Sequence, residues 1–302
     1  MIFVRDKGRL CNNILQYGHV YAWGREHGRK TMSMRFAYKY QYFRICHTPR
    51  HNLLLYLIAK YAAKCHLLPV VTFDQPPAPA VPSDTAAVTV HSIGVLADAP
   101  ADAPAAMLQH RHLIVQGWYA RWYDLFLKYK DEIIDLFAFD DKVKVRPDRL
   151  LEGLKADNRT LILGVHVRRG DYRTFYDGRF FYTDQQYVDI IRQFLSLHND
   201  QPVHIFICGS ERTLDSDYYR SHLSPLTPHP SPHKITLDFP DGNPGEDLYL
   251  LSQCDYLIGP PSTFSLVASM YRDVPLYWIE DPAKPLTEDS FRHFDYLFRH
   301  IY

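Results

Sequence analysis

The stretch Leu161-Ile-Leu-Gly-Val-His-Val-Arg-Arg-Gly-Asp171 begins as an almost wholly apolar run and ends in polar and charged residues. A short, continuous apolar run is typical of a strand in a parallel sheet that is covered on both faces. Side chains alternate between faces in an extended segment, so His166 and Arg168 would share one side, opposite the valines. We therefore expect a buried strand here, with two arginines at its carboxyl end.

Three more apolar runs follow this strand, over residues 203–208, 256–259 and 275–279. Helical patterns separate them, over residues 183–197, 246–254 and 262–271. The first of these helices opens with Thr183 and Gln186, the spacing of a capping box. Continuous apolar strands that alternate with helices predict a parallel α/β sheet, so we expect a Rossmann-like domain over residues 153–302.

The first 152 residues show a more broken version of the same pattern. A strand is expected over 2–5, a helix over 13–27 and a strand-to-helix passage over 113–137. Prolines among many alanines fill residues 74–106, which predicts an irregular insertion with at most a short strand near 87–90. We expect an α/β domain over 1–152, with the domain boundary near 147–158.

The composition describes an ordinary globular chain. Its 302 residues are 46% hydrophobic and 23% charged, which suits two domains. The formal charge is zero, which argues against a dedicated nucleic-acid-binding protein. Five scattered cysteines without a CxxC pair suggest reduced thiols in a cytoplasmic protein and no zinc site. The start of the chain lacks the apolar segment of a signal peptide, and lysines interrupt residues 53–71, so we expect a soluble protein.

The charge is unevenly distributed along the chain. Residues 1–73 hold 12 Lys or Arg against 2 Asp or Glu, a net of +10 that the remainder balances. Such a basic segment suits an anionic partner: a nucleotide, a phospholipid surface or an acidic glycan. Within it, Leu54, Ile58, Tyr61, Cys65 and Leu68 recur at helical spacing. This periodicity predicts a helix whose stripe faces the core, and a membrane-surface helix is the alternative.

The adjacent arginines at the strand end are the strongest chemical signal. An unpaired buried guanidinium is costly, so packing alone does not explain two of them. One of the two arginines could pair with Asp171, which leaves the other available to bind an anion, because the planar donor fork of arginine matches phosphate. A purely structural ion-pair cluster is the alternative. Ligands of open α/β sheets bind at this carboxyl edge.

Two further segments follow strands. Pro260-Pro-Ser-Thr-Phe-Ser265 leads into a helix, where Ser262 or Thr263 is expected as an N-cap. The same helix start could cradle a phosphate. Gly8-Arg-Leu-Cys-Asn-Asn13 follows the first strand and is typical of a turn, although its amides could also face a cleft between domains. No GxGxxG or Walker loop occurs, which weakens dinucleotide and P-loop interpretations.

The segment His166–Asp171 resembles the His-x-Arg-Arg-Gly-Asp signature of the fucosyltransferase superfamily. That superfamily includes bacterial alpha-1,2-fucosyltransferases as well as alpha-1,6-fucosyltransferases and protein O-fucosyltransferases. Three other segments are similar to family motifs in the same order: 8–13, 116–124, and 247–265. Cys11 stands where the family usually has Gly, and Asn13 where it has Gln.

The resemblance implies a GT-B-like α/β fold of two Rossmann-like domains, with the acceptor side in the first and the donor site in the second. It implies GDP-fucose as the donor and no metal or other cofactor. Placed on this sequence, it implies contacts from Arg168 to the diphosphate, from His166 and Asp247 to guanine, from Ser262, Thr263 and Phe264 to the donor, and from Asn12 across the cleft. An acidic residue in a first helical turn, as Asp247 is, also complements the helix dipole.

The expected reaction is inverting, metal-independent transfer of L-fucose to a glycan hydroxyl, and the resemblance favours an alpha-1,2 linkage in bacterial surface-glycan synthesis. Arg168 and Asn12 are the catalytic candidates. Asp171 is the nominal base, although we expect it to pair with Arg169. Asp215-Ser-Asp217 is the lone Asp-x-Asp triplet, and helix capping explains it better than a metal site. Another GDP-sugar, a silent GDP-sugar- or glycan-binding module and a nonspecific phosphate- or nucleic-acid-binding protein are the alternatives. The basic first quarter suggests a lipid-linked acceptor at the inner membrane face.

Overall fold

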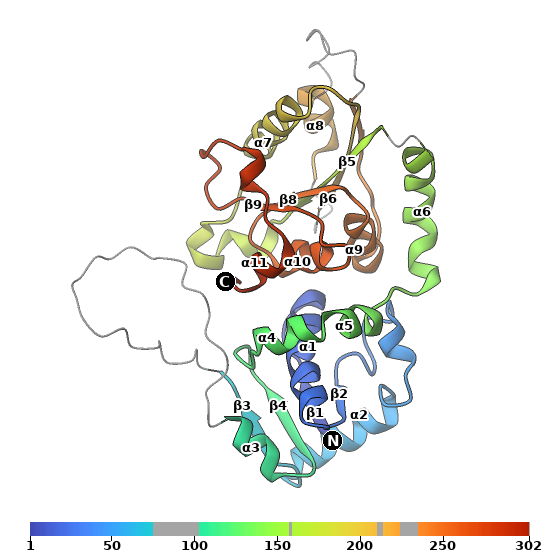
Figure 1. The fold of residues 1–302 in the computed structure, drawn as a ribbon, viewed down its shortest axis with the longest axis vertical. Helices are drawn as coiled ribbons and strands as arrows, with labels where there is room; N and C mark the ends of the chain where they lie inside the picture. Colours follow the sequence, from blue (N-terminus) through green and yellow to red (C-terminus); the bar gives the residue numbers. More distant parts are fainter. Residues whose placement is uncertain (75–102, 157–158, 210–213, 224–234, 302) are drawn as a thin grey trace, which may run out of the picture. The chain divides into compact units, whose positions relative to one another are not determined.

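The computed structural model describes residues 1–74, 103–156, 159–209, 214–223 and 235–301 (Figure 1). The chain forms two compact units. The first contains Met1–Asp140 with Phe298–Ile301, and the second contains Asp141–Leu297. The expected strand near 87–90 lies outside the described residues, as does most of the proline-rich insertion.

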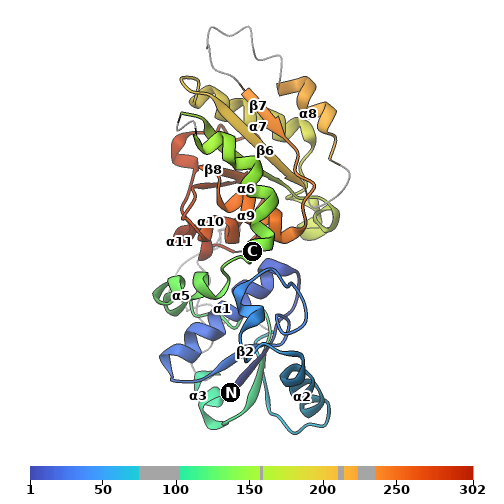
Figure 2. The same ribbon diagram turned by 90° about the vertical axis from the view of Figure 1, so that its right-hand side faces the viewer.

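The second unit is built on a parallel sheet of five strands in the order β7-β6-β5-β8-β9, and Figure 2 shows β6 and β7 side by side. The strands are β5 (Leu161–Val167), β6 (Val203–Gly209), β7 (Ile235–Asp238), β8 (Tyr256–Gly259) and β9 (Leu276–Trp278). The four predicted strands are confirmed. β7 was missed because four half-buried residues leave too short a pattern.

Helices cover both faces of this sheet, as expected for a parallel arrangement. They are α6 (Asp141–Ala156), α7 (Asp184–Leu197), α8 (Ser216–Leu223), α9 (Pro244–Ser252) and α10 (Thr263–Met270). The short helix α11 (Phe294–Phe298) ends in the segment that belongs to the first unit. Val165 packs in one core with Ile190 and Phe194 of α7. On the opposite face Gly164 leaves room for α9, since a Cβ there would lie 2.8 Å from a Leu251 methyl. The predicted capping box of α7 is present between Thr183 and Gln186.

The first unit has a parallel sheet of four strands in the order β2-β1-β4-β3. They are β1 (Ile2–Arg5), β2 (Thr31–Ser33), β3 (Val70–Thr72) and β4 (Leu113–Gln116). The helices are α1 (Leu10–Glu26), α2 (Leu53–Lys64), α3 (Ala103–Gln109), α4 (Tyr123–Lys128) and α5 (Lys130–Leu136). The two three-residue strands escaped the sequence analysis. α6 runs through Pro147, where the sequence suggested a boundary, and belongs to the second unit.

The predicted orientation of α2 is wrong. Its expected core stripe is exposed: Leu54, Ile58 and Tyr61 are 68%, 53% and 56% exposed. Ala59 is instead fully buried, with Leu55 and Ala63 packed against the same core. Because α2 is apolar nearly all round, its sequence periodicity is compatible with burial of either of two faces. The face with Ala59 and Ala63 is the buried one, since these small side chains allow the helix to pack closer to the core.

Candidate functional site

The carboxyl end of β5 places Arg168 in a largely buried position, with its side chain 12% exposed. Its Nη2 donates to both Asp171 oxygens, at 3.0 and 2.9 Å. The guanidinium carbon lies 5.0 Å from the centroid of the Tyr172 ring, a cation–π distance. Within the described residues Arg168 Nε has no hydrogen-bond partner. Asp171 and Tyr172 therefore hold the guanidinium group in place, and its Nε–H is available to donate to a ligand.

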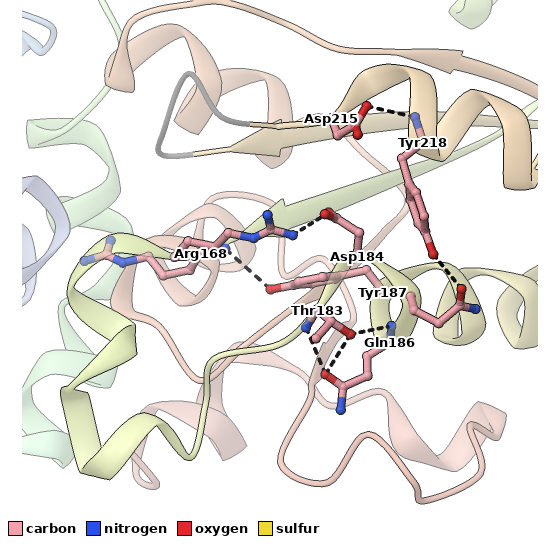
Figure 3. A network of polar contacts seen from close by, with 9 residues as sticks. Arg168, Thr183, Asp184, Gln186, Tyr187, Asp215 and Tyr218 are labelled. Carbon is pink, nitrogen blue, oxygen red and sulfur yellow. Dashed lines mark hydrogen bonds and ion pairs between the residues drawn. The ribbon is translucent and has the colours of Figure 1, made fainter.

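The two arginines take different carboxylates from those expected. Arg169 pairs with Asp184, the first residue of α7, so the predicted pairing of Arg169 with Asp171 is wrong. The backbone N–H of Arg168 points to the Tyr187 hydroxyl at 3.4 Å, beside Asp184 in Figure 3. Consecutive residues diverge at the end of a strand, so Arg169 reaches α7 while Arg168 turns to its own loop.

Replacing Arg169 with glutamine is expected to destabilise the fold by about 1–3 kcal/mol. The carboxylate of Asp184, which is only 22% exposed, would then be largely buried without a charged partner. GDP affinity is expected to stay unchanged. Urea unfolding and calorimetric titration check the two effects. Arg44→Gln, which breaks a pair whose side chains are each 63% exposed, should cost far less; an equal cost would contradict the assignment.

His166 lies on the α9 and α10 face of β5 and is 3% exposed. Its ring centroid is 5.0 Å from that of Phe264, at a tilt of 33°. Burial, with a smaller effect from Arg168, lowers the pKa of His166 to about 3, so the imidazole is neutral. Nδ1 is buried without a hydrogen-bond partner in the described part of the chain. His166 and Phe264 thus form a neutral, partly polar aromatic pair.

Asp247 sits in the first turn of α9 and lines a cavity of about 320 Å³. Burial, and then the charges of Glu246 and Asp241, raises the pKa of Asp247 to about 7. Its Oδ1 is buried and accepts no hydrogen bond from the described residues. The Oδ1 atom of Asp247 is therefore available to accept a hydrogen bond from a ligand in a mostly apolar cavity. The cavity lining is Arg146, Pro147, Arg149, Leu150, Asp238–Gly242, Glu246, Asp247 and Leu250.

The start of α10 approaches the Arg168 loop through Tyr172, whose hydroxyl donates to the carbonyl of Pro261 at 2.5 Å. Of the two residues expected as N-cap, Ser262 takes the position, and its hydroxyl accepts from the backbone N–H of Phe264 at 3.2 Å. Thr263 is the first residue of the helix. The ring beneath Arg168 is thereby tied to the positive end of α10, where anions are favoured.

Asn12 lies in the first turn of α1, in the other unit. The expected turn over 8–13 is mostly helix, since α1 begins at Leu10. Gly8 adopts a φ of +90°, and a Cβ there would lie 2.6 Å from Asn12 Nδ2. Asn13 donates to the Arg9 carbonyl at 2.9 Å, which secures the helix start. The role of Asn12 toward the donor stays a prediction.

The Asp-x-Asp triplet serves as a helix cap. Asp215 accepts from the backbone N–H of Tyr218 at 3.0 Å, the contact drawn in Figure 3. No cluster of three or more His, Cys, Asp or Glu side chains suited to a metal occurs among the described residues.

Sequence reasoning missed Tyr172, Tyr187 and Arg146 as parts of the site. Arg146 on α6 pairs with Asp241 at 2.6 Å and contacts Glu246 at 3.5 Å, so it borders the Asp247 cavity. About a hundred residues separate Arg146 from these carboxylates, and no local pattern marks such a contact. Tyr172 directly follows the arginine signature, but a lone aromatic there gives no signal of its own.

The two α/β units, each built on a parallel sheet, have the architecture of GT-B fucosyltransferases. The chain belongs to Glycosyl transferase family 11, whose sequence profile matches residues 111–272, more than half of its length. The recognition of this superfamily from sequence motifs is confirmed.

Individual relatives are distant. Galactoside alpha-(1,2)-fucosyltransferase 1 from Rattus norvegicus is 25% identical over 183 residues, which are 53% of this chain and only 46% of the rat protein. A mutant of Arabidopsis thaliana FUT1 in complex with GDP superimposes with a TM-score of 0.62 and 15% identity, over 97% of this chain and 73% of that one. POFUT1 in complex with GDP-fucose gives a TM-score of 0.57 at 12% identity, over 90% and 94% of the two chains.

Within the described residues, no helix has both the length and the apolarity needed to cross a bilayer.

Proposed function

We propose that this chain transfers L-fucose from GDP-fucose to a glycan hydroxyl with inversion and without a metal. The observation that carries the proposal is the placement of Arg168: a restrained guanidinium beside the start of α10, in the same unit as the Asp247 cavity. Membership of family 11 and the GDP-fucose named for POFUT1 support the choice of donor.

The guanine base would occupy the Asp247 side of the unit. An ionised carboxylate accepts hydrogen bonds, and guanine offers two neighbouring N–H donors on one edge. The open Oδ1 of Asp247 has the complementary character. His166 and Phe264 would contribute a polar atom and an aromatic face to the nucleoside. Adenine and uracil lack this donor pair, so the site would select guanine.

The diphosphate would lie between Arg168 and the start of α10. As the sugar departs, negative charge grows on the diphosphate while the sugar becomes oxocarbenium-like. The unused guanidinium donor and the helix N-terminus with Ser262 and Thr263 would stabilise that charge. Asp171 already holds Arg168, so we assign it a positioning role rather than that of a general base.

The remaining parts of the proposal concern the acceptor. The first domain, with Asn12, would serve the acceptor side, and the second would hold the donor. An alpha-1,2 linkage in bacterial surface-glycan synthesis follows the motifs shared with that branch. Transfer from another GDP-sugar, or binding without turnover, would be the competing outcomes.

The decisive experiment measures transfer from GDP-fucose, GDP-mannose and UDP-galactose to a panel of galactosides, with and without EDTA. We expect GDP-fucose turnover that EDTA leaves unchanged. Loss of transfer in EDTA, restored by Mg²⁺ or Mn²⁺, would overturn the metal-independent mechanism. Tight GDP binding without transfer to any acceptor would indicate a binding module.

The exposed face of α2 supports a peripheral contact with an anionic bilayer, such as the inner membrane face that would present a lipid-linked acceptor. Leu54 and Ile58 project from it, and Lys60 and Lys64 lie on the same exposed helix. Apolar side chains next to lysines match an interface with anionic headgroups.

Phosphatidylglycerol vesicles are expected to cosediment the protein, whereas phosphatidylcholine vesicles should not. Ile58→Asp is expected to lower binding at least about 5-fold, because a carboxylate would enter the interface against like charge. Val145→Asp, at a similarly exposed apolar position on α6, is the control. Equal sedimentation with both lipids would contradict the contact.

A further inference from the structure

A second cavity, of about 260 Å³, is lined entirely by residues of the first unit. Arg5 ends β1 and Asp6 follows it, while Met34 and Arg35 follow β2. The cavity is therefore at the carboxyl edge of a parallel sheet, the usual place for ligands in α/β units. Tyr38, Tyr56 and Lys60 complete the lining.

Three cations line this cavity. Arg5 donates to the Gln116 side-chain oxygen at 3.0 Å, and Arg35 donates to the Tyr38 hydroxyl at 3.0 Å and the Asp6 carbonyl at 3.3 Å. All these acceptors are neutral. Arg35 also acts electrostatically on Asp6, the one carboxyl group among the lining residues, so three cations face a single carboxyl group in this cavity. Such a concave, positively charged surface attracts an anionic group.

Asp6 provides a polar group within the same lining. It is 3% exposed, and one of its oxygens accepts a hydrogen bond from the Ser33 hydroxyl. The other, Oδ1, is buried and has no hydrogen-bond partner among the described residues. A buried, unsatisfied carboxyl oxygen is costly, and a ligand hydroxyl would satisfy it. Burial also raises the pKa of Asp6 to about 7.

Two tyrosines give the cavity an aromatic wall. The ring centroids of Tyr38 and Tyr56 are 4.5 Å apart at an angle of 40°, and Tyr38 is 43% exposed. Lys60 Nζ lies 5.8 Å from the Tyr56 centroid. Aromatic faces pack against the C–H face of a sugar ring and leave its hydroxyls to polar partners. Cations, an open carboxyl oxygen and an aromatic wall together describe a site for a charged sugar.

We propose that this cavity binds an anionic sugar residue of the acceptor glycan, one that carries a carboxylate or a phosphate. The assignment of this sugar to the acceptor glycan rests on the proposed transferase function. Binding of the sugar to the cavity does not depend on turnover. Arg5, Arg35 and Lys60 receive the anionic group, the tyrosines pack on the ring, and Asp6 takes a hydroxyl.

The test measures binding by calorimetry to the whole protein with four probes: a glucuronate-terminated disaccharide, its glucose-terminated counterpart, glucose 6-phosphate and inorganic phosphate. We expect at least about 10-fold tighter binding of the charged sugars than of the neutral one. Lys60→Gln is expected to weaken charged-sugar binding about 5-fold, and Lys64→Gln, on the same helix but outside the lining, should leave it unchanged. Tyr38→Leu should weaken it, and Tyr296→Leu, at an exposed tyrosine outside the lining, should leave it unchanged.

Equal binding of charged and neutral disaccharides, or equal losses in Lys60→Gln and Lys64→Gln, would overturn the site. If inorganic phosphate bound as tightly as glucose 6-phosphate, the sugar ring would contribute nothing to binding, and the assignment of the cavity as a sugar site would be wrong. GDP affinity and transfer to neutral galactosides, measured on the same sample, separate the two proposals. Fucose transfer without charged-sugar binding refutes this inference alone. Charged-sugar binding without GDP binding refutes the transferase function and, with it, the acceptor role.

Discussion

Arg168→Lys is expected to fold normally and to lose about 10²–10³-fold in kcat, the usual effect of removing one electrostatic donor from a transition state. Lysine keeps the positive charge but lacks the planar guanidinium group. In Arg168 that group donates to both Asp171 oxygens through Nη2 and leaves Nε available for a diphosphate. Steady-state kinetics with GDP-fucose measure the loss, and thermal unfolding checks the fold.

The matched control is Arg173→Lys, in the short 3-10 turn Gly170–Arg173 that follows the same strand. Arg173 is exposed and lies over Phe181 instead of Tyr172, so the same chemical change there should leave kcat unchanged. Full activity of Arg168→Lys would refute the role of the guanidinium, and so would equal losses in both variants.

Asp247→Asn is expected to stabilise the free protein at pH 8 and to weaken GDP binding. The pKa of Asp247 is raised from its ordinary value of 3.8 to about 7, so the folded state favours the protonated carboxyl group. The stability that this proton contributes is present below pH 4 and is lost as pH rises through 7. At pH 8 the ionised group therefore costs the fold up to about 4 kcal/mol, which an amide would recover.

The same substitution removes one of two acceptors that guanine requires, so GDP affinity should fall about 10- to 100-fold at pH 8. For the unmodified protein, affinity should rise with pH through 7 as the carboxylate ionises. Unfolding midpoints and calorimetric titrations at pH 6 and pH 8 check both effects.

Asp141→Asn provides the control, because Asp141 also lies in the first turn of a helix, α6, but is 99% exposed and pairs with Lys144. We expect no gain in stability from it at pH 8. A lower unfolding midpoint for Asp247→Asn, or unaltered GDP affinity, would contradict the assignment of Asp247 to the base.

Local signals explain which elements were predictable. The boundaries of α7 followed from a capping box, and those of β5 from a run of apolar residues that needs no partner to be recognised. β7 lacked such a signal. The exposed stripe of α2 shows the limit of periodicity: two faces of one helix were apolar, and only the contacts of Ala59 decided between them.

The candidate site divides in the same way. The sequence located two arginines at a strand end and narrowed the N-cap of α10 to Ser262 or Thr263, because strand ends and caps depend on neighbouring residues. It assigned Asp171 to the wrong arginine, because Asp184 reaches Arg169 only after α7 has packed against the sheet.

The order of residues alone determined that the second half of this protein is a parallel α/β unit with guanidinium groups at its carboxyl edge, since alternating apolar runs and helices permit few other arrangements. Tertiary structure alone decided which carboxylates restrain those groups, how deeply Asp6 and Asp247 are buried, and which face of α2 meets water. Each of these depends on contacts between segments far apart along the chain, where burial and charge act through space.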